Sequence, residues 1–341
     1  MPTFSKQVLE LDLEAKAEEL SEALREAVLH RLRRRGLVVA VSGGIDSACV
    51  AALAARALGP SRVFALLLPE RDSSAESAEY ATRLCRKLGI EFAVHEISPI
   101  LEAAGCYRLR DEALRSVFPE FTRAMPWKIA MHGDRLHSDA LNLPHAVIAS
   151  PEGERRVRLT PRAYLQIVAA TNFKQRTRKM LEYFHADLRV YAVGGTANRL
   201  EHDQGFFVKL GDGAADVKPI AGLYKTQTYA LAGHLGVIPE ILNRAPTTDT
   251  FSLAQSQEEF FFSLDHRELD LILWAKNHGV APEEVAPVMG HGVEQIVRVY
   301  EDIDQKRRTT AYLHAAPILL EPLPELEPFQ KPPREPGRLV G

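Results

Sequence analysis

The stretch Gly36-Leu37-Val38-Val39-Ala40-Val41-Ser42-Gly43-Gly44-Ile45-Asp46-Ser47 decides the fold class. Its first part, Leu37 to Val41, is a continuous apolar run that is too short for a helix and has glycines on both sides. Such a run is typical of a strand buried on both faces, as in the centre of a parallel sheet. The alanine-rich segment from Ser47 to Leu58 predicts a helix. The stretch therefore predicts a strand, a glycine-rich loop and a helix in succession.

The same alternation continues along the chain. Further buried strands are predicted at residues 63–68, 92–97 and 188–193, and helices at 5–35, 75–88, 161–185, 224–236 and 267–279. Strands and helices that alternate with short connections indicate an α/β fold, a doubly wound parallel sheet of the Rossmann-like three-layer type with right-handed crossovers.

Two segments depart from this pattern. Residues 106–160 contain two short apolar runs around Pro151-Glu152-Gly153, which predict an inserted β-hairpin. Residues 317–341 contain seven prolines and few apolar runs, so they are expected to be extended or disordered. We therefore expect one domain over residues 1–316, with an insertion at 106–160, followed by a proline-rich tail.

Composition narrows the functional class. The chain is 46% hydrophobic and 26% charged, which is ordinary for a globular protein. Lys plus Arg number 42 against 45 Asp plus Glu, a net charge of −3, which argues against a nucleic-acid partner. The three cysteines have no C-x-x-C spacing and there is no run of 18 apolar residues. These features favour a cytoplasmic protein without a membrane partner, a disulfide framework or a zinc cluster.

The loop Ser42 to Ser47 has the composition of an anion-binding loop. Glycines let the backbone approach a phosphate, and the following helix directs its N-terminal dipole at the same place. The loop lacks the Lys-Ser/Thr ending of a Walker loop. Asp46 would repel a phosphate unless a cation lay between them, and Mg²⁺ is the natural candidate. The alternative is a plain Gly-Gly turn with a helix-capping aspartate.

The loop matches the S-G-G-x-D-S signature of the N-type ATP pyrophosphatases, and the second half of the chain carries five more motifs. These are Asn172 to Met180, Gly195-Thr196 with Glu201, Gly205 to Asp216, Leu223 to Gln227, and Ala245-Pro246-Thr247. Their order and spacing resemble the NAD⁺ synthetases over about residues 5–98 and 161–310.

The resemblance implies a role for individual residues. ATP would be bound by Ser42, Gly43, Gly44, Ser47, Thr196, Lys225 and Thr247. Mg²⁺ would be held by Asp46 and Glu201, and the catalytic groups would be Asp46 and Lys225. Deamido-NAD⁺ would contact Arg176, Lys209, Asp216 and Lys306. The residue before Lys306 is Gln305, where many members have histidine, so this sequence departs from the family at that point.

The activity implied by the resemblance is the ATP-dependent amidation of deamido-NAD⁺ by ammonia, with release of AMP and pyrophosphate, in a homodimer. Residues 245–262 are similar to a loop that closes over the nucleotide. We expect no glutaminase domain in this chain, so ammonia would come from free ammonium or a separate glutaminase. The alternatives are a related enzyme that amidates another carboxylate, a catalytically silent nucleotide-binding protein, and a tRNA-modifying pyrophosphatase.

Overall fold

Four short parallel strands form the centre of the molecule in the computed structural model. They are β1 (Leu37–Ala40), β2 (Val63–Leu67), β3 (Glu91–Val94) and β7 (Ala192–Gly194), in the order β3-β2-β1-β7. Leu37 of β1 is in register with Val63 of β2 on one side and with Ala192 of β7 on the other. The structure describes residues 4–132, 143–150, 152–244, 251–253, 261–262 and 264–326.

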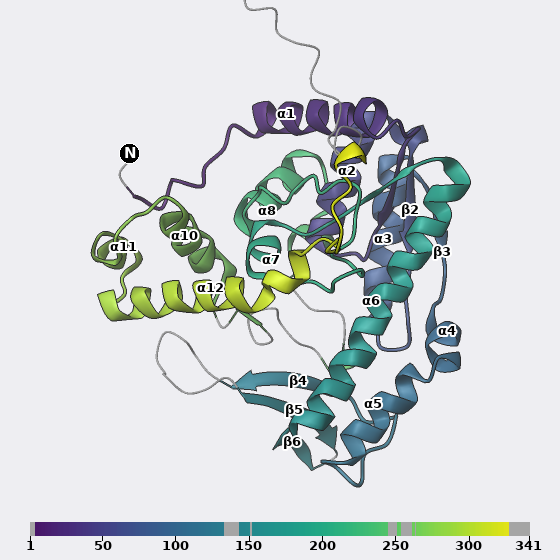
Figure 1. Cartoon of the computed structure of the whole chain (residues 1–341), viewed down its shortest axis with the longest axis vertical. Coiled ribbons are helices and arrows are strands. Elements are labelled where there is room, and N and C mark those ends of the chain that lie inside the picture. Colours follow the sequence, from purple (N-terminus) through teal and green to yellow (C-terminus); the bar gives the residue numbers. More distant parts are fainter. Residues whose placement is uncertain are drawn as a thin grey trace, which may run out of the picture.

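Successive residues of these strands face opposite sides of the sheet, and each side has its own hydrophobic core. Val39 and Ala65 lie in the cluster formed with α1 (Leu13–Arg25), α2 (Ile45–Leu58), α3 (Ala75–Leu88) and α8 (Lys225–His234). Val38 and Phe64 lie in the cluster formed with α4 (Ser98–Ala103) and α6 (Pro161–Arg189). Helices therefore cover both faces (Figure 1), and the predicted doubly wound three-layer α/β fold is confirmed.

Two boundaries differ from the sequence prediction. The first helix, expected over 5–35, is α1, followed by a π-helical segment at Glu26–Arg31. The fourth strand, expected over 188–193, starts later, because α6 continues to Arg189 and ends at Val190. Val190 has a φ of 56°, a left-handed conformation in which a β-branched residue is unusual, so no residue type signals this helix end.

The segment between β3 and α6 contains more structure than the expected hairpin. It contributes α4, α5 (Cys106–Arg115) and an antiparallel sheet in the order β4-β5-β6. The hairpin is present as β5 (Leu143–Ser150) and β6 (Gly153–Arg158). The third strand, β4 (Trp127–His132), pairs Trp127 with Ile148 and was not predicted. Figure 1 shows α6 running from this inserted sheet along the face of the parallel sheet.

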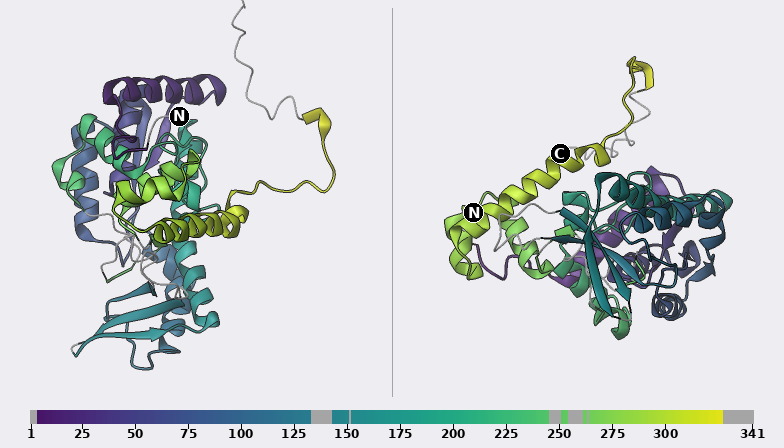
Figure 2. Two further views of the ribbon diagram at one scale, coloured as in Figure 1. Left: turned by 90° about the vertical axis from the view of Figure 1, so that its left-hand side faces the viewer. Right: turned by 90° about the horizontal axis from the view of Figure 1, so that it is seen from below.

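The C-terminal helices form a further core beside the parallel sheet. It is built from α7 (Arg199–Gln204), α10 (His266–Asn277), α11 (Pro282–Met289) and α12 (Val293–His314), and the short α9 (Pro239–Leu242) follows α8. After α12 the chain leaves the body of the molecule (Figure 2), and Ile318 and Leu320 are almost fully exposed. Among the described residues, no helix is long and apolar enough to span a membrane.

Candidate active site

The loop Ser42 to Ser47 connects β1 with α2 and is closed by hydrogen bonds of its two serines. The Ser47 hydroxyl donates to the Gly44 carbonyl at 3.0 Å and accepts from the Ser42 amide at 3.2 Å. Gly43 has a φ of 82°, and a Cβ at this position would lie 2.4 Å from the carbonyl oxygen of Ser77. Only glycine fits there without strain, so the loop keeps its backbone amides at the N-terminus of α2, where anions bind.

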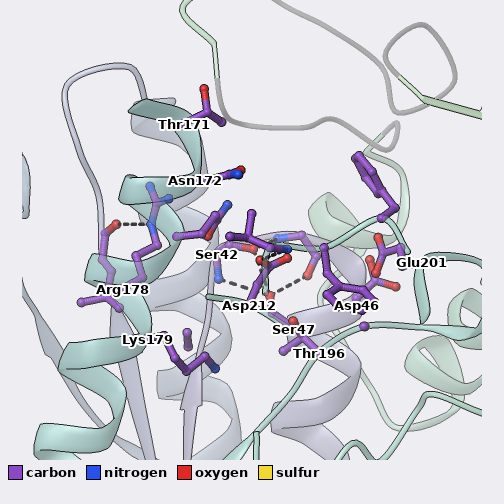
Figure 3. A pocket seen from close by; sticks show the side chains of 18 of the residues that line it. Ser42, Asp46, Ser47, Thr171, Asn172, Arg178, Lys179, Thr196, Glu201 and Asp212 are labelled. Atoms are coloured by element: carbon purple, nitrogen blue, oxygen red, sulfur yellow. Dashed lines mark hydrogen bonds between the residues drawn. The ribbon is translucent and has the colours of Figure 1, made fainter. Parts of the chain in front are cut away.

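The loop opens into a cavity of about 740 Å³ at the carboxyl ends of β1, β2 and β7, where open α/β sheets bind ligands. Figure 3 shows the cavity with Asp46 and Glu201 on one side and Arg178 of α6 on the other. Nine of the residues predicted from the sequence line it: Ser42, Gly44, Asp46, Ser47, Arg176, Thr196, Glu201, Lys209 and Lys225. Thr247 and most of the predicted closing loop lie outside the described residues.

Two carboxylates and one lysine meet at the loop end of the cavity. The Lys225 Nζ lies 2.5 Å from the Asp46 Oδ2 and 3.9 Å from the Glu201 Oε1. Burial alone would lower the pKa of Lys225, but the charges of Asp46 and Glu201 outweigh this effect and raise it above its ordinary value. Lys225 is therefore a permanently charged group in the cavity wall.

Asn198 holds the two carboxylates in place. Its Nδ2 donates to the Asp46 Oδ1 at 2.9 Å, and its Oδ1 accepts from the backbone amide of Glu201 at 3.2 Å. Glu201 completes a capping box at the start of α7, because its side chain accepts from the Asn198 amide. Asn198 is fully buried and was not predicted; nothing distinguishes it in the sequence from an ordinary helix cap.

The donor set fits a magnesium ion. Asp46 and Glu201 contribute hard carboxylate oxygens from two different elements, and both carboxylates lie within 4.0 Å of the Lys225 Nζ. Within the described part of the chain, no group of three or more His, Cys, Asp and Glu side chains is arranged to hold a metal ion. Mg²⁺ is commonly bound by only one or two carboxylates, with substrate phosphates and water as its other ligands.

Asp270 of α10 fixes the N-terminus of α8, the helix that begins with Lys225. Its carboxylate accepts from the Lys225 amide at 3.2 Å, the Thr226 amide at 2.7 Å and the Thr226 hydroxyl at 2.8 Å. Burial raises the pKa of Asp270 to about 6, although the hydrogen bonds from Thr226 oppose this shift. Asp270 was missed in the sequence, where it lies among the polar positions of a predicted helix.

A model of the NAD synthase family matches residues 16–118 and 146–311 of this chain. The chain belongs to the NAD synthase family. Proteins named NH(3)-dependent NAD(+) synthetase are similar to it in Mesorhizobium japonicum (53% identity, covering 92% of this chain and 98% of that protein) and in Rhizobium meliloti (50%, covering 95% and 97%).

Two solved structures share the fold of this NAD synthase family member. The NH3-dependent NAD synthetase from Campylobacter jejuni superposes with a TM-score of 0.58 at 25% identity, covering 91% of this chain and all of that one. The NMN synthetase from Francisella tularensis superposes with a TM-score of 0.61 at 23% identity, covering 91% and 99%. At 23% identity the second likeness concerns the fold alone.

The residues predicted from the sequence to contact deamido-NAD⁺ are spread over two regions. Arg176 and Lys209 line the cavity and touch each other, since the Arg176 Nε donates to the Lys209 carbonyl at 3.2 Å. The Lys209 Nζ donates to the backbone carbonyls of Tyr312 and Ala315, at 2.8 and 2.6 Å. Lys209 thus connects the cavity with the end of α12.

Asp216 and Lys306 do not line this cavity. Asp216 accepts from the Val193 amide at 2.8 Å and from the Tyr183 hydroxyl at 3.2 Å, and it borders a separate, smaller pocket. The Lys306 Nζ forms an ion pair with Asp302 at 2.7 Å. Gly43 also lies behind the lining, where it shapes the loop. The roles of Asp216 and Lys306 in substrate binding stay predictions.

The cavity also contains charged groups for which no individual role was predicted from the sequence. The Arg178 Nε donates to the carbonyl of Leu68 at 3.1 Å, and the Lys179 Nζ pairs with Glu182 at 2.7 Å. Glu182 is buried and Asp212 is half-buried, and desolvation raises the pKa of each carboxyl. Their sequence positions resemble a solvated helix face and a glycine-rich turn, so only the fold reveals that they converge.

Proposed function

We propose that this chain amidates deamido-NAD⁺ to NAD⁺ with ammonia, consuming ATP and releasing AMP and pyrophosphate. The observation that carries the proposal is the meeting of the loop Ser42 to Ser47 with Asp46, Glu201 and Lys225 in one cavity. The relatives named NH(3)-dependent NAD(+) synthetase cover nearly the whole chain, which supports the same activity here.

The chemistry explains why ATP is needed. Ammonia does not displace the oxygen of a carboxylate, because that oxygen is too basic to leave. The substrate carboxylate therefore attacks the α-phosphorus of ATP, the bond to the pyrophosphate oxygen breaks, and an acyl adenylate forms. Ammonia then attacks the acyl carbon, AMP leaves with the bonding electrons, and the surplus proton of the nitrogen passes to water or a base. Positioning and charge neutralisation are what such phosphoryl chemistry requires from a protein.

The residues of the cavity meet these requirements. The amides at the start of α2 would bind the phosphates, and Lys225 would neutralise charge that develops on the departing pyrophosphate. Asp46 and Glu201 would hold a magnesium ion, which supplies Lewis-acid stabilisation of phosphate oxygens. In this arrangement no side chain needs to act as a nucleophile, and Cys49, Cys85 and Cys106 are all buried.

The test is an NAD⁺-forming assay with ATP, Mg²⁺, ammonium and deamido-NAD⁺, read by alcohol dehydrogenase. We expect NAD⁺, AMP and pyrophosphate in equal amounts, and no activity when glutamine replaces ammonium. Pyrophosphate release with another carboxylate, but none with deamido-NAD⁺, would support the alternative of a related amide-forming enzyme. Activity with glutamine only after adding a second protein would identify a separate glutaminase as the ammonia source.

We also propose that the protein is a cytoplasmic homodimer in which α6 forms part of the interface. The outward face of α6 carries Leu165, Met180, Phe184 and Leu188, each more than half exposed. Large exposed apolar side chains commonly mark protein–protein contacts, and a second copy can cover them symmetrically. The buried, reduced cysteines suit a reducing compartment.

A further inference from the structure

Helix α5, which precedes the inserted sheet, is attached to α6 and to the end of β2 by a buried ionic network. The Lys174 Nζ of α6 lies 2.7 Å from both Glu70 and Asp72, which follow β2. Arg110 of α5 donates to Asp72 at 2.7 Å and also pairs with its neighbour Asp111. All five side chains are at least nine-tenths buried. Removing one member would leave an uncompensated charge, so the network keeps α5 in one position relative to the end of β2.

The first strand of the inserted sheet holds a segment that is distant in sequence. The Trp127 amide donates to the Ser252 hydroxyl at 3.0 Å, and the Leu253 amide donates to the Trp127 carbonyl at 3.0 Å. The ring of Phe251 packs edge-on against the Trp127 ring, with the ring centres 5.0 Å apart. Residues 251–253 therefore lie along β4, and we call this arrangement the Trp127 clasp.

The clasp places an apolar surface in the active-site cavity. Phe251 lines the cavity together with Ile129 of β4, and Tyr164 and Val168 of α6 continue the same lining. Phe251 is 6% exposed and is packed in the core of the inserted sheet, which fixes its position. The family model does not match residues 119–145, so Ile129 of β4 lies outside the matched part, whereas Tyr164, Val168 and Phe251 lie within it.

We propose that this apolar wall receives the purine ring of an adenine nucleotide and that Phe251 is a specificity-determining contact for it. The inference rests on the proposed function, because ATP and deamido-NAD⁺ both contain adenosine. The wall suits a planar aromatic base, since aromatic side chains bind bases through their faces and edges. It cannot suit a phosphate, because an apolar wall offers a buried charge no partner. The charged end of the cavity, at Asp46 and Lys225, takes the phosphates instead.

The test compares two phenylalanines of the same core. Phe251→Leu removes the aromatic ring from the cavity wall, while Phe121→Leu makes the same change in the same hydrophobic cluster, outside the cavity lining. Binding of ATP and of deamido-NAD⁺ to each variant is measured separately by titration calorimetry, beside the urea unfolding curve. We expect Phe251→Leu to weaken one nucleotide by about tenfold, or about 1.4 kcal/mol, and Phe121→Leu to change neither.

Each outcome decides the proposal. Weaker binding of ATP alone assigns the wall to the ATP purine, and weaker binding of deamido-NAD⁺ alone assigns it to the dinucleotide. Unchanged binding of both nucleotides to Phe251→Leu overturns the proposal, as does an equal loss in both variants that follows their loss of stability. A wild-type protein that binds ATP but forms no NAD⁺ overturns the proposed function alone. The role of the apolar wall is still decided by comparing nucleotide binding in the Phe251→Leu and Phe121→Leu variants.

A second pair of variants tests the clasp itself. Ser252→Ala removes the acceptor of the Trp127 amide, and Ser150→Ala removes a hydroxyl at the exposed hairpin end of the same sheet, where it donates to Gly153. We expect Ser252→Ala to raise the KM of the same nucleotide about threefold or more with kcat retained, as for a loss of roughly 0.7 kcal/mol of uniform binding. Equal KM values in both variants would show that the Trp127 clasp does not contribute to nucleotide binding.

Discussion

Replacing Asp270 by asparagine tests how a buried carboxylate holds the start of α8. The carboxylate of Asp270 accepts three hydrogen bonds from Lys225 and Thr226, and its side chain has no exposure to solvent. Asparagine has nearly the same shape but can accept through only one oxygen, and it carries no charge. The variant should therefore lose some stability at every pH and also lose the pH dependence that the charge creates.

The structure sets the size of this pH dependence. Burial raises the pKa of Asp270 from 3.8 to about 6, so the folded protein binds this proton more tightly than the unfolded chain does. The stabilising effect of that proton is complete below pH 3.8 and is lost as the pH rises through 6. A shift of about two pKa units corresponds to roughly 3 kcal/mol of unfolding free energy.

The measurement is urea unfolding of the wild type and of Asp270→Asn at several pH values from 4 to 7.5. The difference between the two unfolding free energies isolates Asp270, because all other titrating groups are common to both proteins. We expect the advantage of the wild type to shrink by up to about 3 kcal/mol across this range. Two curves that stay parallel from pH 4 to 7.5 would refute the reasoning.

Three further predictions concern the loop, the metal and the interface. Asp46→Asn keeps the shape of the side chain but removes a charge that would hold Mg²⁺, so kcat should fall roughly 100-fold or more while the thermal melting curve is retained; wild-type activity would remove Asp46 from the site. Gly43→Ala forces a left-handed residue against the Ser77 carbonyl, so it should cost about 2 kcal/mol or more in urea unfolding; an unchanged midpoint would contradict the loop geometry. Leu188→Glu should shift the light-scattering mass from twice 37.9 kDa towards 37.9 kDa, whereas Leu320→Glu, on the exposed C-terminal segment, should not; equal masses would exclude α6 from the interface.

The parallel sheet was predictable because its signals are local. Leu37 to Val41 is apolar without interruption, as a strand covered on both faces must be, and the loop that follows has glycine at the position that needs a positive φ. The end of α6 was not predictable in the same way. Val190 takes a left-handed conformation although it is not a glycine. The boundary between the helix and the following strand therefore cannot be located from residue types alone.

The candidate site was predictable only where a residue lies in a motif of its own. Asp46, Glu201 and Lys225 lie in three separate motifs, and the fold brings them to one point. Asn198 and Asp270 act by holding those residues, and a supporting hydrogen bond leaves no pattern in a single sequence. The contact of β4 with residues 251–253 was missed for a related reason, because that segment is distant in sequence and the contact is visible only in space.

The ammonium group of Lys209 can bind either the backbone carbonyls at the end of α12 or an anionic ligand in the cavity. It donates to the Ala315 carbonyl and shares the Tyr312 carbonyl with the Ala315 amide, at the end of α12 where the helix dipole is negative. An anionic ligand that drew Lys209 into the cavity would remove its hydrogen bonds to the Tyr312 and Ala315 carbonyls, and the Tyr312 carbonyl would keep only its bond from the Ala315 amide. Ligand binding that uses Lys209 would therefore weaken the hydrogen bonding at the end of α12. By reciprocity, a change that loosens this helix end would make Lys209 more available to the ligand.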